Sequence, residues 1–313
     1  MENLILSFEV VLPLLIMMML GLFLRSVHLV SDSTVKQLNN VVFRVFLPVL
    51  LFCNVYHCDL NGTIRPRLMI FAPVCVIISF FLTFAVICLA EKINARRGVL
   101  IQGIFRSNFI IFGLPVTISL YGEEAGGIAA LLIAVIIPIF NVFSVAALEI
   151  FSGSGKFDWK KILKGIVTNP LIIASVLALI FLFSGLKIPT VLDDVLTDIG
   201  SVATPLGLMI LGASFAFSAV RDRLREIIIG VAGKLILVPA IFLPIAIAMG
   251  FRDAELVALL ALFGSPTAVS SFTMAQQMGG DSELAGHLVV LGSLFSIITM
   301  FFWIFALKQL GFI

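Results

Sequence analysis

Long apolar runs alternate with short polar connections along the whole chain. Most of the runs approach the roughly twenty residues that an α-helix needs to cross the hydrocarbon core of a bilayer. The pattern therefore predicts an all-α membrane protein with ten transmembrane helices. The predicted spans are residues 4–24, 37–57, 67–90, 98–120, 127–151, 162–184, 196–219, 226–250, 253–277 and 284–307.

Two of these runs contain an internal Gly-x-Pro step. The fourth span includes the sequence SNFIIFGLPVTISLYG, in which Gly113 begins the step and Pro115 ends it, and the ninth has Gly-Ser-Pro ending at Pro266. Proline removes a backbone hydrogen bond and clashes with the preceding turn. Hydrocarbon offers no water to repair the loss, so a break at this depth must be buried in protein or line a wet cavity. We predict that both helices are broken at these steps.

Proline landmarks recur in the same order in the two halves of the chain. Pro48 and Pro115 lie in the second and fourth spans, and Pro205 and Pro266 lie in the seventh and ninth. Each half has five spans, so the second half must enter the membrane from the opposite face. Paired helix breaks in such inverted repeats point to a binding site. The predicted units are a first five-helix repeat (1–151), a short cytoplasmic linker (152–161) and a second five-helix repeat (162–313).

Composition fixes the broad class. The chain is 61% hydrophobic and 12% charged, with a mean hydropathy of +1.20, whereas about 25% of the residues in soluble domains are charged. A net charge of +2 from dispersed basic residues gives no surface for nucleic acid, so the expected partners are lipids and small solutes. Lys and Arg are concentrated in the connections after odd-numbered spans, which predicts that these face the cytoplasm and that both termini lie outside.

The broken helices are the predicted binding site. Interrupting a helix exposes amide groups at the start of the following half-helix, near Pro115 and Pro266, and these partly positive ends suit an anion. Carboxylate oxygens for a divalent cation are lacking here, so we expect no metal. The alternative is that the hydroxyls cap freed backbone groups or pack between helices. The polar side chains nearby are Ser107, Asn108, Thr117, Ser265, Thr267, Ser270, Ser271 and Thr273.

Three basic residues lie part-way into predicted spans, where charge is expensive. Arg44, Arg106 and Lys234 are all near the predicted cytoplasmic ends, so each can extend its charged group to the lipid headgroups. The functional alternative is an anion funnel or gate on the cytoplasmic side, or a charge that pairs with a substrate carboxylate. Arg106, two residues before Asn108, is the best placed for that role.

Several segments resemble the auxin efflux carrier family, including its bacterial malate and malonate permease-like members. They are LPVLLF, NFIIFGLPVTISLYGEEA, TNPLIIASVLAL, TPLGLMILGASF and GSPTAVSSFTMAQQMGGD, and the resemblance covers nearly the whole chain. It implies a fold like that of sodium/proton antiporters, in which helices 4 and 9 cross at their breaks. Helices 1, 2, 6 and 7 would form a scaffold that also makes a homodimer, and helices 3–5 and 8–10 a mobile core.

The resemblance also implies the site and the activity. Asn108, Pro115, Pro266 and Thr267 would contribute from the core, and Asn54 from the scaffold. The expected protein is a secondary transporter in the cell membrane that moves a small organic anion, such as malate, malonate or an auxin-like acid, by alternating access. The alternatives are a cation-coupled carrier of another solute and a passive anion channel. The motifs of metalloproteases and ATPases are absent from the sequence, so we expect neither an enzyme nor a cofactor.

Overall fold

The computed structural model describes residues 2–58, 65–152, 159–217 and 219–313. All regular elements within these residues are helices. Those of the first half are α1 (Glu2–Ser26), α2 (Asp32–Val41), η1 (Val42–Phe46), α3 (Leu47–Tyr56), α4 (Pro66–Ala90), α5 (Asn94–Phe105), η2 (Phe109–Gly113) and α6 (Leu114–Phe151), where η denotes a π-helical turn.

The second half continues in the same way. Its elements are α7 (Trp159–Thr168), α8 (Pro170–Ser184), α9 (Thr190–Ser201), α10 (Ala203–Ser214), α11 (Ala219–Asp222), α12 (Leu224–Ala232), η3 (Gly233–Leu237), α13 (Val238–Ala248), α14 (Asp253–Gly264), α15 (Ser270–Gln277) and α16 (Ser282–Gln309).

Six continuous helical segments in the described part of the chain are long and apolar enough to cross a membrane, or seven if the bent pair α7–α8 is one span. These six segments and the bent pair together overlap seven of the ten predicted spans. The other three predicted spans are not among these segments. Within α1 the apolar helix counted is the shorter segment Val11–Ser26, and the spans predicted over 98–120 and 253–277 are each interrupted.

The surface of the helices is strongly apolar. Large hydrophobic side chains with most of their area exposed occur on several of the candidate spans, among them Ile70, Leu89, Phe183 and Phe302. Exposed apolar surface on this scale is unfavourable in water and favourable against lipid. The fold therefore has the character of a multi-pass membrane protein.

The first interruption does not fall where the sequence predicted it. Helix α5 ends at Phe105, the chain is non-helical over residues 106–108, and helix resumes at Phe109, ahead of Gly113 and Pro115. Pro115 is the second residue of α6, which continues directly from η2, so this proline follows one π-helical turn of helix and does not break it. The prediction placed the break too late, because proline chemistry alone does not show which residues another segment will pair with.

A proline follows shortly after each of the π-helical turns η1, η2 and η3. Turns η1, η2 and η3 end two residues before Pro48, Pro115 and Pro239 respectively. A proline ring clashes with the carbonyl four residues earlier in an α-helix. The wider i→i+5 turn moves that carbonyl away, and π-helical turns are frequent at functional sites. Here η2 directly follows the interruption at 106–108.

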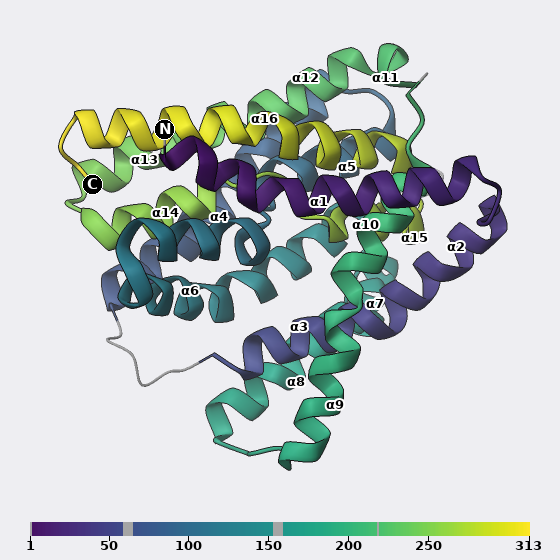
Figure 1. Cartoon of the computed structure of the whole chain (residues 1–313), viewed down its shortest axis with the longest axis horizontal. Coiled ribbons are helices and arrows are strands. Elements are labelled where there is room, and N and C mark those ends of the chain that lie inside the picture. The colour runs from purple at the N-terminus through teal and green to yellow at the C-terminus, as the bar shows by residue number, and fades with distance from the viewer. Residues whose placement is uncertain (1, 59–64, 153–158, 218) are drawn as a thin grey trace.

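The helices form two groups (Figure 1). Helices α3, α8 and α9 pack together at the bottom of the view, and α10 leads from them to α1. The remaining group contains α4, α5, α6, α13, α14 and α16, with the contacts α5–α6, α6–α14 and α13–α14 at its centre. Both chain ends lie at the same, left-hand end of the view. Helices α3, α10 and α15 and residues 106–111 all contribute to one cavity between the groups.

Helices α1 and α10 approach unusually closely. A Cβ atom added at Gly21 would lie 1.9 Å from the carbonyl oxygen of Met209, and one added at Gly212 would lie 1.9 Å from that of Met18. Neither position can hold a larger residue without the two helices moving apart. Small residues of this kind allow helix backbones to pack in membranes, where no hydrophobic force drives helices together.

Candidate functional site

The two interrupted helices meet side by side. Ser107 and Thr267 form an isolated antiparallel bridge, and the Asn108 amide donates to the Pro266 carbonyl oxygen at 2.7 Å. The Thr267 hydroxyl donates to the carbonyl oxygen of Gly103 at 2.7 Å, one of the last carbonyls of α5, which have no partner inside the helix. Each interruption therefore provides hydrogen-bond partners for backbone groups that the other interruption leaves without partners in their own helix.

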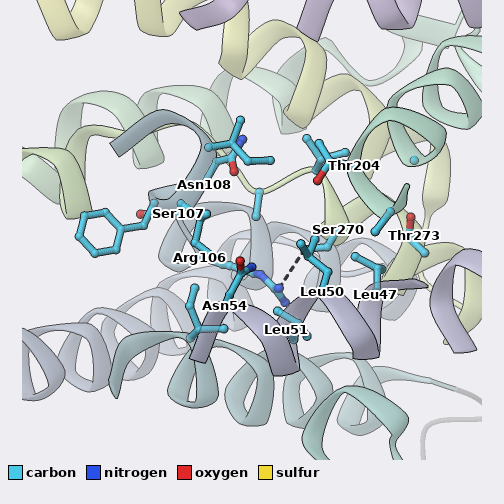
Figure 2. Close-up of a pocket in the computed structure, with 18 of the residues that line it drawn as sticks. Leu47, Leu50, Leu51, Asn54, Arg106, Ser107, Asn108, Thr204, Ser270 and Thr273 are labelled. Carbon is cyan, nitrogen blue, oxygen red and sulfur yellow. Dashed lines mark hydrogen bonds between the residues drawn. The ribbon is translucent and has the colours of Figure 1, made fainter. Parts of the chain in front are cut away.

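A cavity of about 80 Å³ lies beside this junction. Figure 2 shows labelled side chains from four parts of the chain around the same space: Asn54 of α3, Arg106 to Asn108, Thr204 of α10, and Ser270 and Thr273 of α15. Most of the remaining lining is apolar. The apolar residues are Val42, Leu47, Leu50, Leu51, Phe109, Ile110, Ile111, Ile137, Ala203, Ala268 and Val269.

Arg106 is the one charged residue among the described residues that line the cavity. Its side chain is buried with 3% of its surface exposed. One terminal nitrogen donates to the Ser270 hydroxyl at 2.9 Å, a contact drawn in Figure 2, and the other lies 2.8 Å from the Met274 sulfur. Both partners are neutral. Burial of a charge is costly without a counter-charge, so this guanidinium is prepared to bind an anion.

Two amide side chains in the cavity have donors without partners. The Nδ2 atoms of Asn54 and Asn108 are both buried, and neither makes a hydrogen bond with any described residue. Asn108 is only 5% exposed. Buried polar groups are nearly always hydrogen-bonded, and an exception needs a reason. A solute with acceptor oxygens would satisfy both donors.

The amino-terminal end of α15 faces the same cavity. Val269 and Ser270, at the first residues of this eight-residue helix, belong to the lining. Partly positive amides at a helix start favour an anion. Together with Arg106 and the free amide of Asn108, they give the cavity a positive character.

The other predicted residues lie around the cavity rather than on it. Gly113 is packed against the Phe109 ring, and Ser265, the residue after the end of α14, donates to the carbonyl oxygen of Ala261 in that helix. Pro115 is part of α6 beyond the cavity. Thr267 and Pro266 hold the junction through the hydrogen bonds described above. Of the polar and charged residues named from the sequence, those that line the cavity are Asn54, Arg106, Ser107, Asn108, Ser270 and Thr273.

The two remaining basic residues have different surroundings. Lys234, in η3, is 1% exposed and donates to the Ser107 hydroxyl, but it does not line the cavity. Arg44, in η1, is exposed and also lies outside the lining. Arg106 thus lines the cavity, Lys234 is separated from the cavity by the Ser107 side chain, and Arg44 lies on the surface.

Thr204 lines the cavity and was not selected from the sequence. It directly precedes Pro205, one of the repeating prolines, and that neighbour was the available signal. Nothing in the spacing of α10 distinguishes its cavity face from its other faces, because the helix is apolar nearly all round.

Comparison with known proteins identifies the class. A family model described as "Membrane transport protein" matches residues 6–304. The chain belongs to this family, the auxin efflux carrier-like membrane transporters, and the resemblance drawn from its sequence is confirmed.

Similar relatives extend over nearly the full length. An uncharacterized transporter of Methanocaldococcus jannaschii is 25% identical over 305 residues, which is 94% of this chain and 97% of the relative. One from Methanothermobacter thermautotrophicus is 24% identical over 307 residues, covering 95% and 97%. The uncharacterized transporter YfdV of Escherichia coli is 25% identical over 309 residues, covering 94% and 95%.

Proposed function

We propose that this protein is a secondary transporter that carries a small organic anion by alternating access. The observation that carries the proposal is the cavity at the junction of the two interrupted helices, where Arg106 and the free amides of Asn54 and Asn108 meet. Broken helices that turn their ends toward a shared site are the usual binding device of such transporters. The family assignment supports transport as the activity.

We further propose that the chain crosses the cell membrane ten times as two inverted repeats. The interrupted segments 98–120 and 253–277 would each complete a crossing, as would α1. The position of both termini at one end of the molecule supports an even number of crossings (Figure 1). The basic connections after odd-numbered spans favour both termini outside.

The mechanism follows from the two helix groups. Asn54 and Thr204 reach the cavity from α3 and α10, whereas Arg106 and Asn108 reach it from the junction. A solute held by both sets would be bound between a scaffold and a core. Movement of the core past the scaffold would then expose it to each side in turn.

Binding and counterflow test the proposal. Purified protein is screened by thermal shift against mono- and dicarboxylates at two pH values, and each hit is followed by radiolabel counterflow in proteoliposomes. We expect saturable binding and counterflow for at least one carboxylate. Flux without saturation or counterflow would instead identify a channel. A response to sodium or a neutral solute, with none to any carboxylate, would identify a different carrier.

A further inference from the structure

Among the residues that the structure describes, the cavity lining has one positive side chain and no acidic one. Within the described ranges, no carboxylate lies within 4.0 Å of the Arg106 guanidinium, although several other arginines there form ion pairs with carboxylates. Its hydrogen bonds go to a hydroxyl and a thioether. A guanidinium has five N–H donors, so several remain for a bound molecule.

The second buried cation is kept away from the cavity. Lys234 reaches the hydroxyl of Ser107, and that hydroxyl donates in turn to the carbonyl oxygen of Leu262. Ser107 lines the cavity and Lys234 does not. Among the described lining residues, a molecule in the cavity can therefore contact one full positive charge directly, together with neutral amides, hydroxyls and apolar walls.

We propose that the cavity binds a carboxylate with one negative charge, paired one-to-one with Arg106. The inference rests on the proposed function and adds the charge of the substrate. A guanidinium and a carboxylate form a planar, two-point contact. The second charge of a dicarboxylate would have no counter-charge among the described residues that line the cavity, and an unpaired buried charge is costly. Apolar walls such as Leu50 and Val269 instead suit a short hydrocarbon body.

Pairing of the substrate carboxylate with Arg106 affects how transport depends on the membrane potential. The carboxylate cancels the charge of Arg106, so the loaded site crosses the membrane field with no net charge from this pair. The empty site crosses as a cation. Exchange of bound anions uses only the loaded form and will not respond to membrane potential, whereas one unpaired charge moving through the whole field would change the equilibrium up to about fiftyfold per 100 mV.

Matched acids test the charge of the substrate. Propionate is compared with malonate, butyrate with succinate, and 3-hydroxybutyrate with malate, at pH 8, where both carboxyl groups of the diacids are ionised. We expect each monocarboxylate to inhibit counterflow at a concentration at least tenfold lower than its diacid. Equal or tighter binding of the diacids would overturn the one-to-one pairing and leave carboxylate transport standing. Failure of every acid would overturn the proposed function itself.

Substitution of the arginine tests its role. We expect Arg106→Gln to weaken the thermal-shift response to butyrate at least tenfold while its response to the neutral butyramide is kept, and we expect Arg106→Lys to retain part of the butyrate response. Arg221→Gln is the matched control, because that arginine, in α11, is exposed and outside the cavity. Loss of both responses together in a folded Arg106→Gln protein would show a packing defect and overturn the pairing.

Voltage supplies a test on the wild-type protein, in case Arg106→Gln does not fold. Exchange of labelled for unlabelled butyrate is measured in proteoliposomes at 0 and −100 mV, set by a potassium gradient with valinomycin. We expect the two exchange rates to agree within twofold. A change of fivefold or more would show that the loaded site carries net charge and would overturn the inference.

Discussion

The main-chain amide of Asn108 donates to the carbonyl oxygen of Pro266 at 2.7 Å. This bond joins two interruptions that lie in different halves of the chain. It satisfies the main-chain N–H of Asn108, while the side-chain Nδ2 of this residue, which lines the cavity, has no hydrogen-bond partner among the described residues. One residue therefore both closes the junction and offers a donor to a solute.

Removal of that donor gives the first prediction. Asn108→Ala keeps the backbone bond to Pro266 but deletes the side-chain amide, so we expect counterflow of the carboxylate hit to fall at least tenfold with little change in the melting temperature. Asn40→Ala is the control, since Asn40 is a half-buried asparagine of α2 outside the cavity. Normal counterflow by the Asn108 variant would refute the assignment of this residue.

The Thr267 hydroxyl gives a prediction about stability. It donates to the Gly103 carbonyl oxygen at 2.7 Å in a buried setting. Thr267→Val keeps the shape and leaves that carbonyl unpaired, which costs about 1–3 kcal/mol. We expect a lower melting temperature in detergent, whereas Thr267→Ser, which keeps the hydroxyl, stays closer to wild type. Equal melting temperatures for the Val and Ser variants would show that the bond is unimportant.

The two Gly-x-Pro prolines are expected to differ. Pro266 lies inside the second interruption, between α14 and α15, whereas Pro115 lies in α6 after the helix has resumed. Pro266→Ala lets helix propagate into the junction, so we expect a larger loss of uptake than for Pro115→Ala. Both variants are compared at equal membrane expression. A greater loss for Pro115→Ala would place the functional kink in the Gly-Leu-Pro step instead.

The sequence located the junction but not its exact geometry. The paired Gly-x-Pro steps indicated the fourth and ninth spans, the family resemblance implied Asn108, and Arg106 was favoured because it lies two residues before Asn108. The break at residues 106–108 could not be placed, because it depends on pairing with the Pro266 segment. Sequence favoured Arg106 over Arg44 only because it lies two residues before Asn108, and it could not show that tertiary packing buries Arg106 and leaves Arg44 exposed.

Thr204 is a second cavity residue whose position could not be predicted from the sequence. Its contribution depends on which face of α10 turns toward α15 and the junction, and an apolar helix carries no pattern that fixes its rotation. The three π-helical turns were likewise not predicted. Each precedes a proline, but other prolines, such as Pro73 and Pro138, lie inside helices without such a turn.

Orientation in the membrane gives a further prediction. If the connections after odd-numbered spans face the cytoplasm, both termini lie outside. We expect alkaline phosphatase fused after Ile313 to be active in bacterial cells and green fluorescent protein fused there to be dark. Fusions after Ser152, at the cytoplasmic linker, should give the opposite pair of results. The same response at both junctions would contradict ten crossings.

The contact between α1 and α10 gives the last prediction. A methyl group at Gly21 would lie 1.9 Å from the Met209 carbonyl oxygen, so Gly21→Ala must push the two helices apart. Overpacking of this kind costs about 1–3 kcal/mol. Gly127→Ala is the matched control, because Gly127 lies in α6 with no atom within 4 Å of an added Cβ, and both changes raise helix propensity equally. We expect a lower melting temperature and poorer yield for the Gly21 variant alone, measured by fluorescence-detected size exclusion after heating. Equal losses in the two variants would show that the close approach of α1 and α10 does not govern stability.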